Sequence, residues 1–387
     1  MKFVSKILKL SLGLATAMAL VPGASFAQHY TQTNLVSDIP GMAPTPDGNL
    51  VNPWGITRSS GGPWWVSDNN SGLSTLYTGT GQIILINGDG KVTIPGPKNA
   101  PASFLAAPTG IVFNESSDFV LPAPNSQPAG FIFVTEDGTI SGWNGGPAAV
   151  LAVDNNDNGS PNGAVYKGAT IAVNNGTRYL YVTNFRAGRV EVYDTNFKPV
   201  HLSDEAFDSG KDGDDDHDDG DGAEHIPHGF APFNIQNIGG SLFVTYAKQD
   251  PTRHDDTAGD GSGYVEIFTP AGKHVGHLQH GPWLNSPWGI VWTPRDFGTF
   301  SNTILVGNFG SGWIAAFNGF TDKFIGFVKA PDDSLLTIDG LWSLTFGNNG
   351  AAGPSTTLFF TAGLDHETHG LFGTLTPVKA ENDESTE

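Results

Sequence analysis

Short runs of β-branched and aromatic residues recur along the chain from residue 30 onward, and clusters of glycine, proline, asparagine and aspartate separate them. Such runs occupy residues 64–68, 131–135, 179–183, 242–246, 304–308 and 358–361. A further run closes most units, and in 189–193 and 264–268 inward and outward residues alternate. These runs are typical of β-strands, and none of the units has a helical period. The pattern predicts an all-β protein.

A short motif precedes these runs six times. Its full form is Pro-Trp-Gly-Ile at residues 53–56 and 287–290, and Pro-Thr-Gly-Ile at 108–111. Degenerate copies occupy residues 168–171, 231–235 and 340–344. The copies lie 54 to 64 residues apart, and each unit offers three or four short strands. Six such units predict a six-bladed β-propeller.

The two ends of the chain predict how the ring closes. The last unit reaches only its third strand, at residues 370–375, whereas residues 31–36 belong to no unit. We therefore expect the N-terminal strand to complete the last blade, which removes sheet edges that would otherwise be open to aggregation.

The repeat resembles NHL-type repeats and the wider gluconolactonase-like six-bladed propellers. The segments 52–56, 164–168, 231–235 and 369–373 together are similar to a family of secreted bacterial propellers whose function is uncharacterised. The resemblance covers essentially the whole mature chain. It implies the fold and no particular activity.

Composition narrows the classes of partner. Gly 51 and Pro 26 among 387 residues predict many turns, and a charged fraction of 15% argues against coiled coils. Lys+Arg 19 against Asp+Glu 39 gives a formal net charge of −20, so the surface repels phosphate backbones and nucleic acid is not an expected partner. With Cys 0, no disulfide stabilises the fold.

The first residues predict an exported protein. Lysines at positions 2, 6 and 9 precede an apolar run at 10–21, and small residues at 25 and 27 fit a cleavage site, so residues 1–27 are expected to be a signal peptide. The run is too short for a membrane anchor, and no membrane span is expected. We expect an extracytoplasmic protein, periplasmic or secreted.

The remaining chain divides into three parts. Residues 28–378 are expected to form the propeller, interrupted by an acidic insertion at 203–224, and residues 379–387 to form a disordered polar tail. The insertion is rich in aspartate and glycine, so a solvated loop is expected, with weak calcium binding as the alternative.

Four aromatic residues are candidates for ligand binding. Inner strands of a propeller begin on the face where second strands end, so the starts of the repeats should surround one mouth of the central channel. The position between proline and glycine, or its equivalent, carries Trp54, Phe233, Trp288 and Trp342. These rings could stack on a sugar or another flat ligand. The alternative is that they plug the channel and pack blade against blade.

The ends of second strands supply candidate metal ligands, namely Asp68, Glu136, Asn184 and Asn308. Their oxygens suit Ca²⁺ or another hard divalent cation. The resemblance to gluconolactonase-like enzymes implies a divalent metal held on the axis by such residues. This chain departs from that pattern, since aromatic residues replace the Asn or Asp at the start of inner strands. The alternative role is turn formation.

Two polar loops on the same face are candidates for chemistry. One contains His254 and Asp255, and the other contains Glu367 and His369. A histidine with a nearby carboxylate can act as a general base and its orienting partner, although turn polarity also explains these residues. In contrast, His274 and His277 would alternate faces in an extended strand, so they are expected to lie on a surface strand.

Three functions fit the sequence. The first is a propeller that binds a small molecule, a carbohydrate or a protein partner at the aromatic face of its channel, with calcium assisting. The second is a metal-dependent lactonase, hydrolase or lyase that uses the same face. The third is a structural protein of the cell envelope. The fold alone does not distinguish them.

Overall fold

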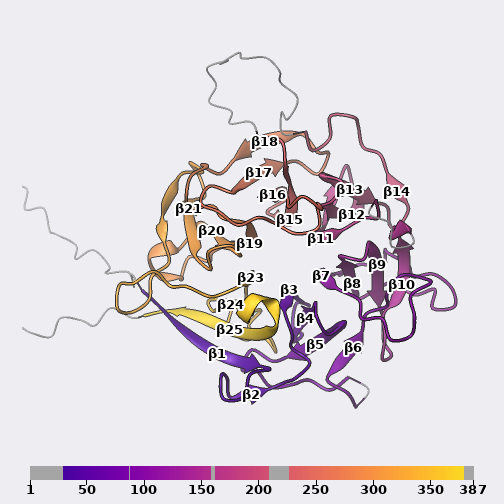
Figure 1. The fold of residues 1–387 in the computed structure, drawn as a ribbon, viewed down its shortest axis with the longest axis horizontal. Helices are drawn as coiled ribbons and strands as arrows, with labels where there is room; N and C mark the ends of the chain where they lie inside the picture. The colour runs from indigo at the N-terminus through magenta and orange to yellow at the C-terminus, as the bar shows by residue number, and fades with distance from the viewer. Residues whose placement is uncertain (1–28, 87, 158–161, 209–225, 379–387) are drawn as a thin grey trace, which may run out of the picture.

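The computed structural model describes residues 29–86, 88–157, 162–208 and 226–378. Six sheets stand around a central axis, and each successive unit of the chain forms one blade of antiparallel strands (Figure 1). This arrangement confirms the predicted six-bladed β-propeller. The predicted signal peptide at 1–27, the centre of the acidic insertion and the tail at 379–387 lie outside the described residues.

Each blade is a meander whose first strand lies innermost. Blade 1 contains β3 (Pro53–Arg58), β4 (Trp64–Asp68), β5 (Leu73–Tyr77) and β6 (Lys91–Thr93). Blade 2 contains β7 (Pro108–Phe113), β8 (Phe131–Thr135), β9 (Thr139–Trp143) and β10 (Val150–Asp154). Blade 3 contains β11 (Tyr166–Asn174), β12 (Thr177–Asn184), β13 (Arg189–Tyr193) and β14 (Pro199–Val200).

The second half of the ring repeats this plan. Blade 4 contains β15 (Phe230–Ile238), β16 (Ser241–Lys248), β17 (Gly263–Phe268) and β18 (His274–His277). Blade 5 contains β19 (Pro287–Trp292), β20 (Thr303–Asn308), β21 (Ile314–Asn318) and β22 (Phe324–Phe327), with a 3₁₀ turn, η2 (Gly298–Phe300), before β20. Blade 6 contains β23 (Leu341–Phe346), β24 (Leu358–Gly363), the short α1 (Leu364–Glu367) and β25 (His369–Pro377).

The N-terminal strand completes the ring, as predicted. β1 (Tyr30–Ser37) pairs antiparallel with β25, and Figure 1 shows the indigo strand beside the yellow one. A two-residue strand, β2 (Thr45–Pro46), then adds in parallel to β1, so blade 6 has five strands. This fifth strand is an addition that the repeat pattern does not contain.

The repeated motif marks the place where inner strands converge on the axis. In all six blades the pairing of the first and second strands shifts register at the motif. A Cβ atom at Gly55 would lie 2.6 Å from the carbonyl oxygen of Thr109, and one at Gly289 would lie 2.5 Å from that of Trp342. The glycine therefore lets neighbouring inner strands approach closely, and the bulge bends each strand at that point.

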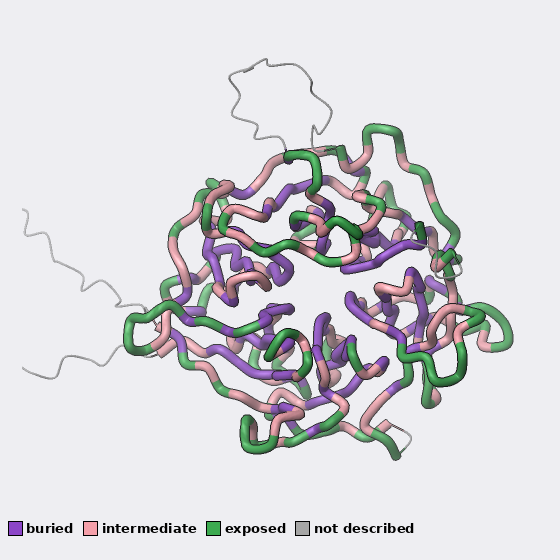
Figure 2. Tube along the Cα trace, viewed as in Figure 1, coloured by how far each residue is buried: buried purple, intermediate pink, exposed green. Residues whose placement is uncertain are grey.

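The hydrophobic core is divided among the interfaces between blades. One cluster joins residues such as Leu305 and Ile314 of blade 5 to Leu341 and Phe360 of blade 6. Figure 2 shows buried residues along the strands and exposed residues mainly in the loops around the rim. Among the described residues there is no helix long and apolar enough to cross a membrane. Packing between blades thus holds the inner strands, and with them the channel mouth, in fixed positions.

Candidate functional site

The four predicted aromatic residues form the floor of the channel mouth. Trp54, Phe233, Trp288 and Trp342 are only 0–3% exposed and belong to one hydrophobic cluster. The rings of Trp54 and Trp342 stack with centroids 3.5 Å apart, and the ring of Trp288 meets that of Trp54 edge-on at 6.0 Å. This packing fits the alternative of a channel plug. Ligand stacking on these rings stays a prediction, for which the structure offers little exposed ring surface.

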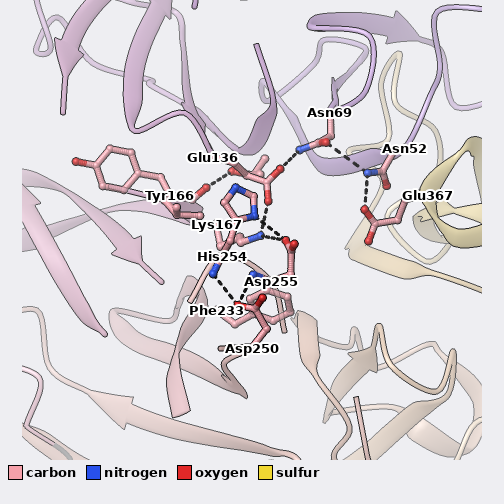
Figure 3. Close-up of polar contacts among 12 residues, drawn as sticks. Asn52, Asn69, Glu136, Tyr166, Lys167, Phe233, Asp250, His254, Asp255 and Glu367 are labelled. Carbon is pink, nitrogen blue, oxygen red and sulfur yellow. Dashed lines mark hydrogen bonds and ion pairs between the residues drawn. The ribbon is translucent and has the colours of Figure 1, made fainter. Parts of the chain in front are cut away.

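A buried lysine covers this aromatic floor. Lys167 is the second residue of β11, and its side chain is 1% exposed. Its ammonium nitrogen lies 5.0 Å from the ring centroid of Trp54 and 5.7 Å from that of Phe185, a cation–π arrangement. The same nitrogen contacts a carboxylate oxygen of Glu136 and lies 3.3 Å from Oδ1 of Asp255 (Figure 3). The ammonium is therefore neutralised by two carboxylates.

Asparagines extend this network across the mouth. Nδ2 of Asn69 donates a 2.8 Å hydrogen bond to Oε2 of Glu136. Nδ2 of Asn52 donates to Oε2 of Glu367 at 3.1 Å, while its Oδ1 accepts from the indole of Trp342 at 3.0 Å. Asn52 also lies 3.4 Å from Asn69 (Figure 3). The chain of contacts thus connects Glu136 of blade 2 to Glu367 of blade 6.

The predicted pair of His254 and Asp255 lies at this network. Both residues follow β16, and Nδ1 of His254 lies 2.9 Å from Oδ1 of Asp255. Oδ1 of Asp250 accepts from the backbone N–H of His254 at 2.9 Å and holds the loop in a turn. The side chains of His254 and Asp255 are 38% and 65% exposed, so a ligand can reach them.

Glu367 enters the mouth through an unusual backbone conformation. Asp365, His366 and Glu367 all have positive φ angles, of 50°, 54° and 65°, so α1 is a left-handed turn. Left-handed backbone costs non-glycine residues roughly 1–2 kcal/mol each. Strain of this kind persists only where surrounding contacts impose it, and it is concentrated at functional sites.

The charged groups at the mouth shift one another's pKa values. Burial raises the pKa of Glu367 to about 7, and the carboxylate of Glu136 adds to the rise. Burial alone would lower the pKa of Lys167, but the facing carboxylates of Glu136 and Asp255 hold it above its usual value. The hydrogen bond between His254 and Asp255 raises the pKa of the imidazole and lowers that of the carboxyl. A proton is therefore gained and lost near neutral pH at this mouth.

His369, the fourth candidate for chemistry, has a different partner. Its Nδ1 lies 2.7 Å from Oδ2 of Asp38, and the two residues join the start of β25 to the loop after β1. This contact gives His369 a role at the junction that closes the ring. The structure thus brings His254, Asp255 and Glu367 into one network through Glu136 and Lys167. The imidazole of His369 points instead to Asp38, and His369 meets the network only through its backbone carbonyl, which accepts from the N–H of Asn52 at 3.4 Å.

The remaining candidate metal ligands make hydrogen bonds to nearby strands and loops. Asp68 is fully buried and Oδ2 accepts from the backbone N–H of Thr75 at 2.9 Å. Nδ2 of Asn184 donates to Glu191 at 2.9 Å. Oδ1 of Asn308 accepts from the backbone N–H of Asn285 at 2.8 Å. Oδ1 of Asp68 has no hydrogen-bond partner in the described part of the chain. Joint coordination of calcium by these residues with Glu136 stays a prediction.

A different set of residues at the mouth could hold a cation. Ligand atoms of Glu136, His254 and Asp255 all lie within 4.8 Å of one another. The ammonium of Lys167 contacts two of the three, so it already supplies the positive charge that a metal would supply there. Calcium prefers six to eight oxygen ligands, and this set fits that preference poorly.

The opposite end of the channel is a separate hollow. A cavity of about 420 Å³ is lined by the inner strands, including Thr57, Asn114, Asn237 and Thr345. Trp288 lines this cavity and also belongs to the aromatic floor of the mouth. Trp288 therefore stands between this cavity and the channel mouth.

Lys167 and Asn52 are the residues of this network that the sequence analysis missed. Lys167 stands directly before the degenerate motif at 168–171, in a strand whose other members are uncharged. A charged residue at the start of an inner strand was the available signal. This signal does not identify a site, because a lone lysine is ordinarily a surface residue.

Comparison with known proteins establishes relatives but no activity. No family model matches the sequence. The chain is 30% identical over 352 residues to uncharacterized protein L690 of Acanthamoeba polyphaga mimivirus, which covers 88% of this chain and 84% of the relative. The predicted membership of a secreted bacterial family is supported only as far as an uncharacterised propeller family, since this relative is viral.

Several solved structures are similar to this chain over most of its length. The GH93 α-L-arabinofuranosidase of Fusarium graminearum matches 90% of this chain and 98% of its own with 11% identity and a TM-score of 0.52. Virginiamycin B lyase of Staphylococcus aureus matches 90% and 99% with 11% identity and a TM-score of 0.45. A gluconolactonase of Xanthomonas campestris matches 70% and 86% with 12% identity and a TM-score of 0.36.

At 11% identity, the similarity to the arabinofuranosidase bears on the fold alone. The viral relative is informative in a different way, because its similarity extends over most of both chains. The chain therefore belongs to the family of the uncharacterised mimivirus protein L690.

Proposed function

We propose that the channel mouth binds a small polar molecule and catalyses acid–base chemistry on it. The observation that carries this proposal is convergence. Glu136, Lys167, the pair of His254 and Asp255, and Glu367 come from blades 2, 3, 4 and 6 and meet in one network above the aromatic floor (Figure 3). Stability does not require strained backbone and buried charge at one point, whereas catalysis benefits from both.

The exposed groups are assigned to proton transfer. The contact of Nδ1 with Asp255 orients the imidazole of His254, which leaves Nε2 as the nitrogen that can meet a ligand. The half-buried carboxyl of Glu367, with a pKa of about 7, is the second group that can give or take a proton near neutral pH. Two such groups suit an elimination or a hydrolysis, so the enzyme class proposed is a lyase or a hydrolase.

Lys167 is assigned a positioning role. Because its side chain is 1% exposed, it does not face a ligand, but it holds Glu136 and Asp255 in place. The negative charge of the mouth and the formal net charge of −20 disfavour anionic substrates. We therefore propose a neutral substrate rich in hydroxyl, ester or lactone groups. With the predicted signal peptide, the protein would meet this substrate outside the cytoplasm.

Metal assistance is the second candidate for this site. The ligand atoms of Glu136, His254 and Asp255 favour it by their spacing, and the ammonium of Lys167 opposes it. The two mechanisms make different predictions. Acid–base catalysis by the side chains alone continues after removal of divalent cations by a chelator, whereas a metal-dependent lactonase or lyase loses activity.

The test is a screen with matched variants. Purified protein is assayed between pH 5 and 9 on a panel of neutral glycosides, lactones and carboxylic esters, and binding is followed by thermal shift. We expect E367Q and H254N to lose roughly 10²–10⁴-fold of any turnover. The control variants are E115Q and H201N, which change exposed residues outside the mouth. Parent-like turnover in E367Q and H254N, or a panel without turnover and without thermal shift, would contradict the proposal.

A further inference from the structure

A second group of metal-ligating side chains lies far out on blade 4, away from the inner strands. Glu266 is on β17, and His274 and His277 are on the outermost strand, β18. One ligand atom from each lies within 4.8 Å of the other two. Nε2 of His274 lies 2.5 Å from Oε2 of Glu266, whose side chain is 5% exposed. A nearly buried carboxylate is costly unless a cation or hydrogen bonds compensate it.

A bulge in β18 brings the two histidines together. Glu266 pairs with His277 and Phe268 pairs with His274, but the register shifts between these pairs, which leaves Val275 as the extra residue. Glu266 and Phe268 are two residues apart and share one face of β17. Their partners therefore share that face as well. Regular alternation would have placed His274 and His277 on opposite faces, as the sequence analysis expected.

Blade 5 provides an internal comparison. Its outer strands have the same bulged register, in which Ala315 pairs with Phe327 and Phe317 pairs with Phe324. Thus Ala315, Phe324 and Phe327 occupy the positions that Glu266, His274 and His277 occupy in blade 4. The rings of Phe324 and Phe327 pack at 5.1 Å. Apolar residues satisfy this position structurally, so the fold does not demand a carboxylate and two imidazoles there.

We propose that Glu266, His274 and His277 form a binding site for a divalent transition-metal ion of the zinc type. Two imidazoles and one carboxylate are a donor set that suits Zn²⁺ and leaves a fourth position for water. Among the described residues, no ion pair joins Glu266 to a lysine or an arginine, in contrast to the channel mouth. A metal ion would replace the hydrogen bond between His274 and Glu266 and would cross-link β17 to β18.

The experiment titrates the full chain with metal ions after treatment with a chelator. Zn²⁺ binding is measured by calorimetry at pH 7.5, and Co²⁺ serves as a spectroscopic probe because nitrogen-rich tetrahedral sites give intense visible absorption. We expect one equivalent of Zn²⁺, tetrahedral Co²⁺ bands, and an affinity that falls as the pH is lowered, because protons compete with the metal for its ligand atoms. The melting temperature should rise with Zn²⁺.

The matched variant is E266A/H274F/H277F, which copies the residues of blade 5 and should therefore fold. It is expected to lose the equivalent of Zn²⁺ and the tetrahedral bands, whereas H254N, altered only at the channel mouth, keeps both. Anomalous diffraction at the zinc edge locates the ion in the parent. Binding that persists in the triple variant, an ion found elsewhere, or a parent that binds no Zn²⁺ would overturn the proposal.

Discussion

Lys167 illustrates how a single residue determines the character of the channel mouth. Its ammonium contacts Glu136 and lies between the rings of Trp54 and Phe185, where water has little access. A buried charge pair contributes little net stability compared with apolar residues, but removal of one partner leaves the other charge unpaired. The pair is therefore more easily explained by the position it gives to Asp255 than by stability.

Removal of the ammonium should destabilise the protein strongly. Lys167→Met keeps the aliphatic length of the side chain but leaves Glu136, which is 10% exposed, beside an apolar group. We expect a loss of about 3–5 kcal/mol in the free energy of unfolding, measured by denaturant titration. The double variant K167M/E136Q should recover part of this loss, because no charge remains unpaired. A single variant as stable as the parent would contradict the pairing argument.

Glu367 should make stability fall as pH rises. Its folded pKa of about 7 lies above the ordinary value of 4.5, so the folded state holds its proton between these values while the unfolded state releases it. The stabilising contribution is present below pH 4.5 and is lost as pH rises through 7. E367Q should therefore show a flatter melting temperature between pH 5 and 8 than the parent. The control D365N changes an exposed neighbour and should retain the slope of the parent.

At the level of single residues, sequence reasoning identified polar loops but not their connections. His254 and Asp255 are adjacent in sequence, so their pairing is local and could be anticipated. Lys167 meets Glu136 and Asp255 across three blades, a relation that depends on the closure of the whole ring. The left-handed turn at α1 gives the side chains of Glu367 and His369 different partners. This turn could not be predicted, because positive φ angles at non-glycine residues leave no clear sequence signal.

At the level of elements, bulges determine which side chains share a face. The motif at 53–56 was recognisable because the bulge and its glycine recur in other blades. The bulge around Val275 was not recognisable, since strict alternation was the only available rule for β18. A one-residue insertion moves every later side chain to the other face. A prediction based on alternation is therefore wrong beyond a bulge.

The aromatic floor is the element-scale contact that holds inner strands of different blades together. Trp288 on β19 is 3% exposed, and its indole N–H donates to the backbone carbonyl of Lys167 at 3.2 Å. Trp288→Ala should cost about 3–5 kcal/mol of the free energy of unfolding. Trp292→Ala, at the half-buried end of the same strand, is the matched control and should cost less. Iodide quenching of indole fluorescence then measures whether the floor is open to solvent.

At the scale of the whole molecule, the fold was predictable because every blade meets the same packing constraint at the axis. Inner strands of neighbouring blades must approach closely at the axis, so glycine recurs at positions such as 55, 110 and 289. Such repetition makes the number of blades readable, whereas β2 escaped notice because two residues beside β1 have no repeated partner. The site was only partly readable because its side chains come from different blades and obey no repeat.

Tyr30 is the residue of β1 that we expect to contribute most to ring closure. Tyr30 is fully buried and reaches blade 5, where its hydroxyl donates to the carbonyl of Phe297 at 2.8 Å and accepts from the N–H of Phe300 at 3.2 Å. Its ring also packs against both phenylalanine rings, at 4.8 and 6.0 Å. Burial raises the pKa of Tyr30 to about 12, so the hydroxyl stays protonated and keeps donating.

Variants of Tyr30 should therefore show separately how much its hydroxyl and its ring stabilise the closed propeller. Tyr30→Phe keeps the ring and leaves the N–H of Phe300 without this acceptor, for an expected cost of about 1–3 kcal/mol. Tyr30→Ala also removes the ring and should cost about 3–5 kcal/mol. Deletion of residues 28–38 should go further, because it exposes the edge of β25 and promotes aggregation at a lower melting temperature. Deletion of residues 379–387 is the control. If the 28–38 deletion melted at the temperature of the parent and stayed monomeric, β1 would not be the strand that holds the ring closed.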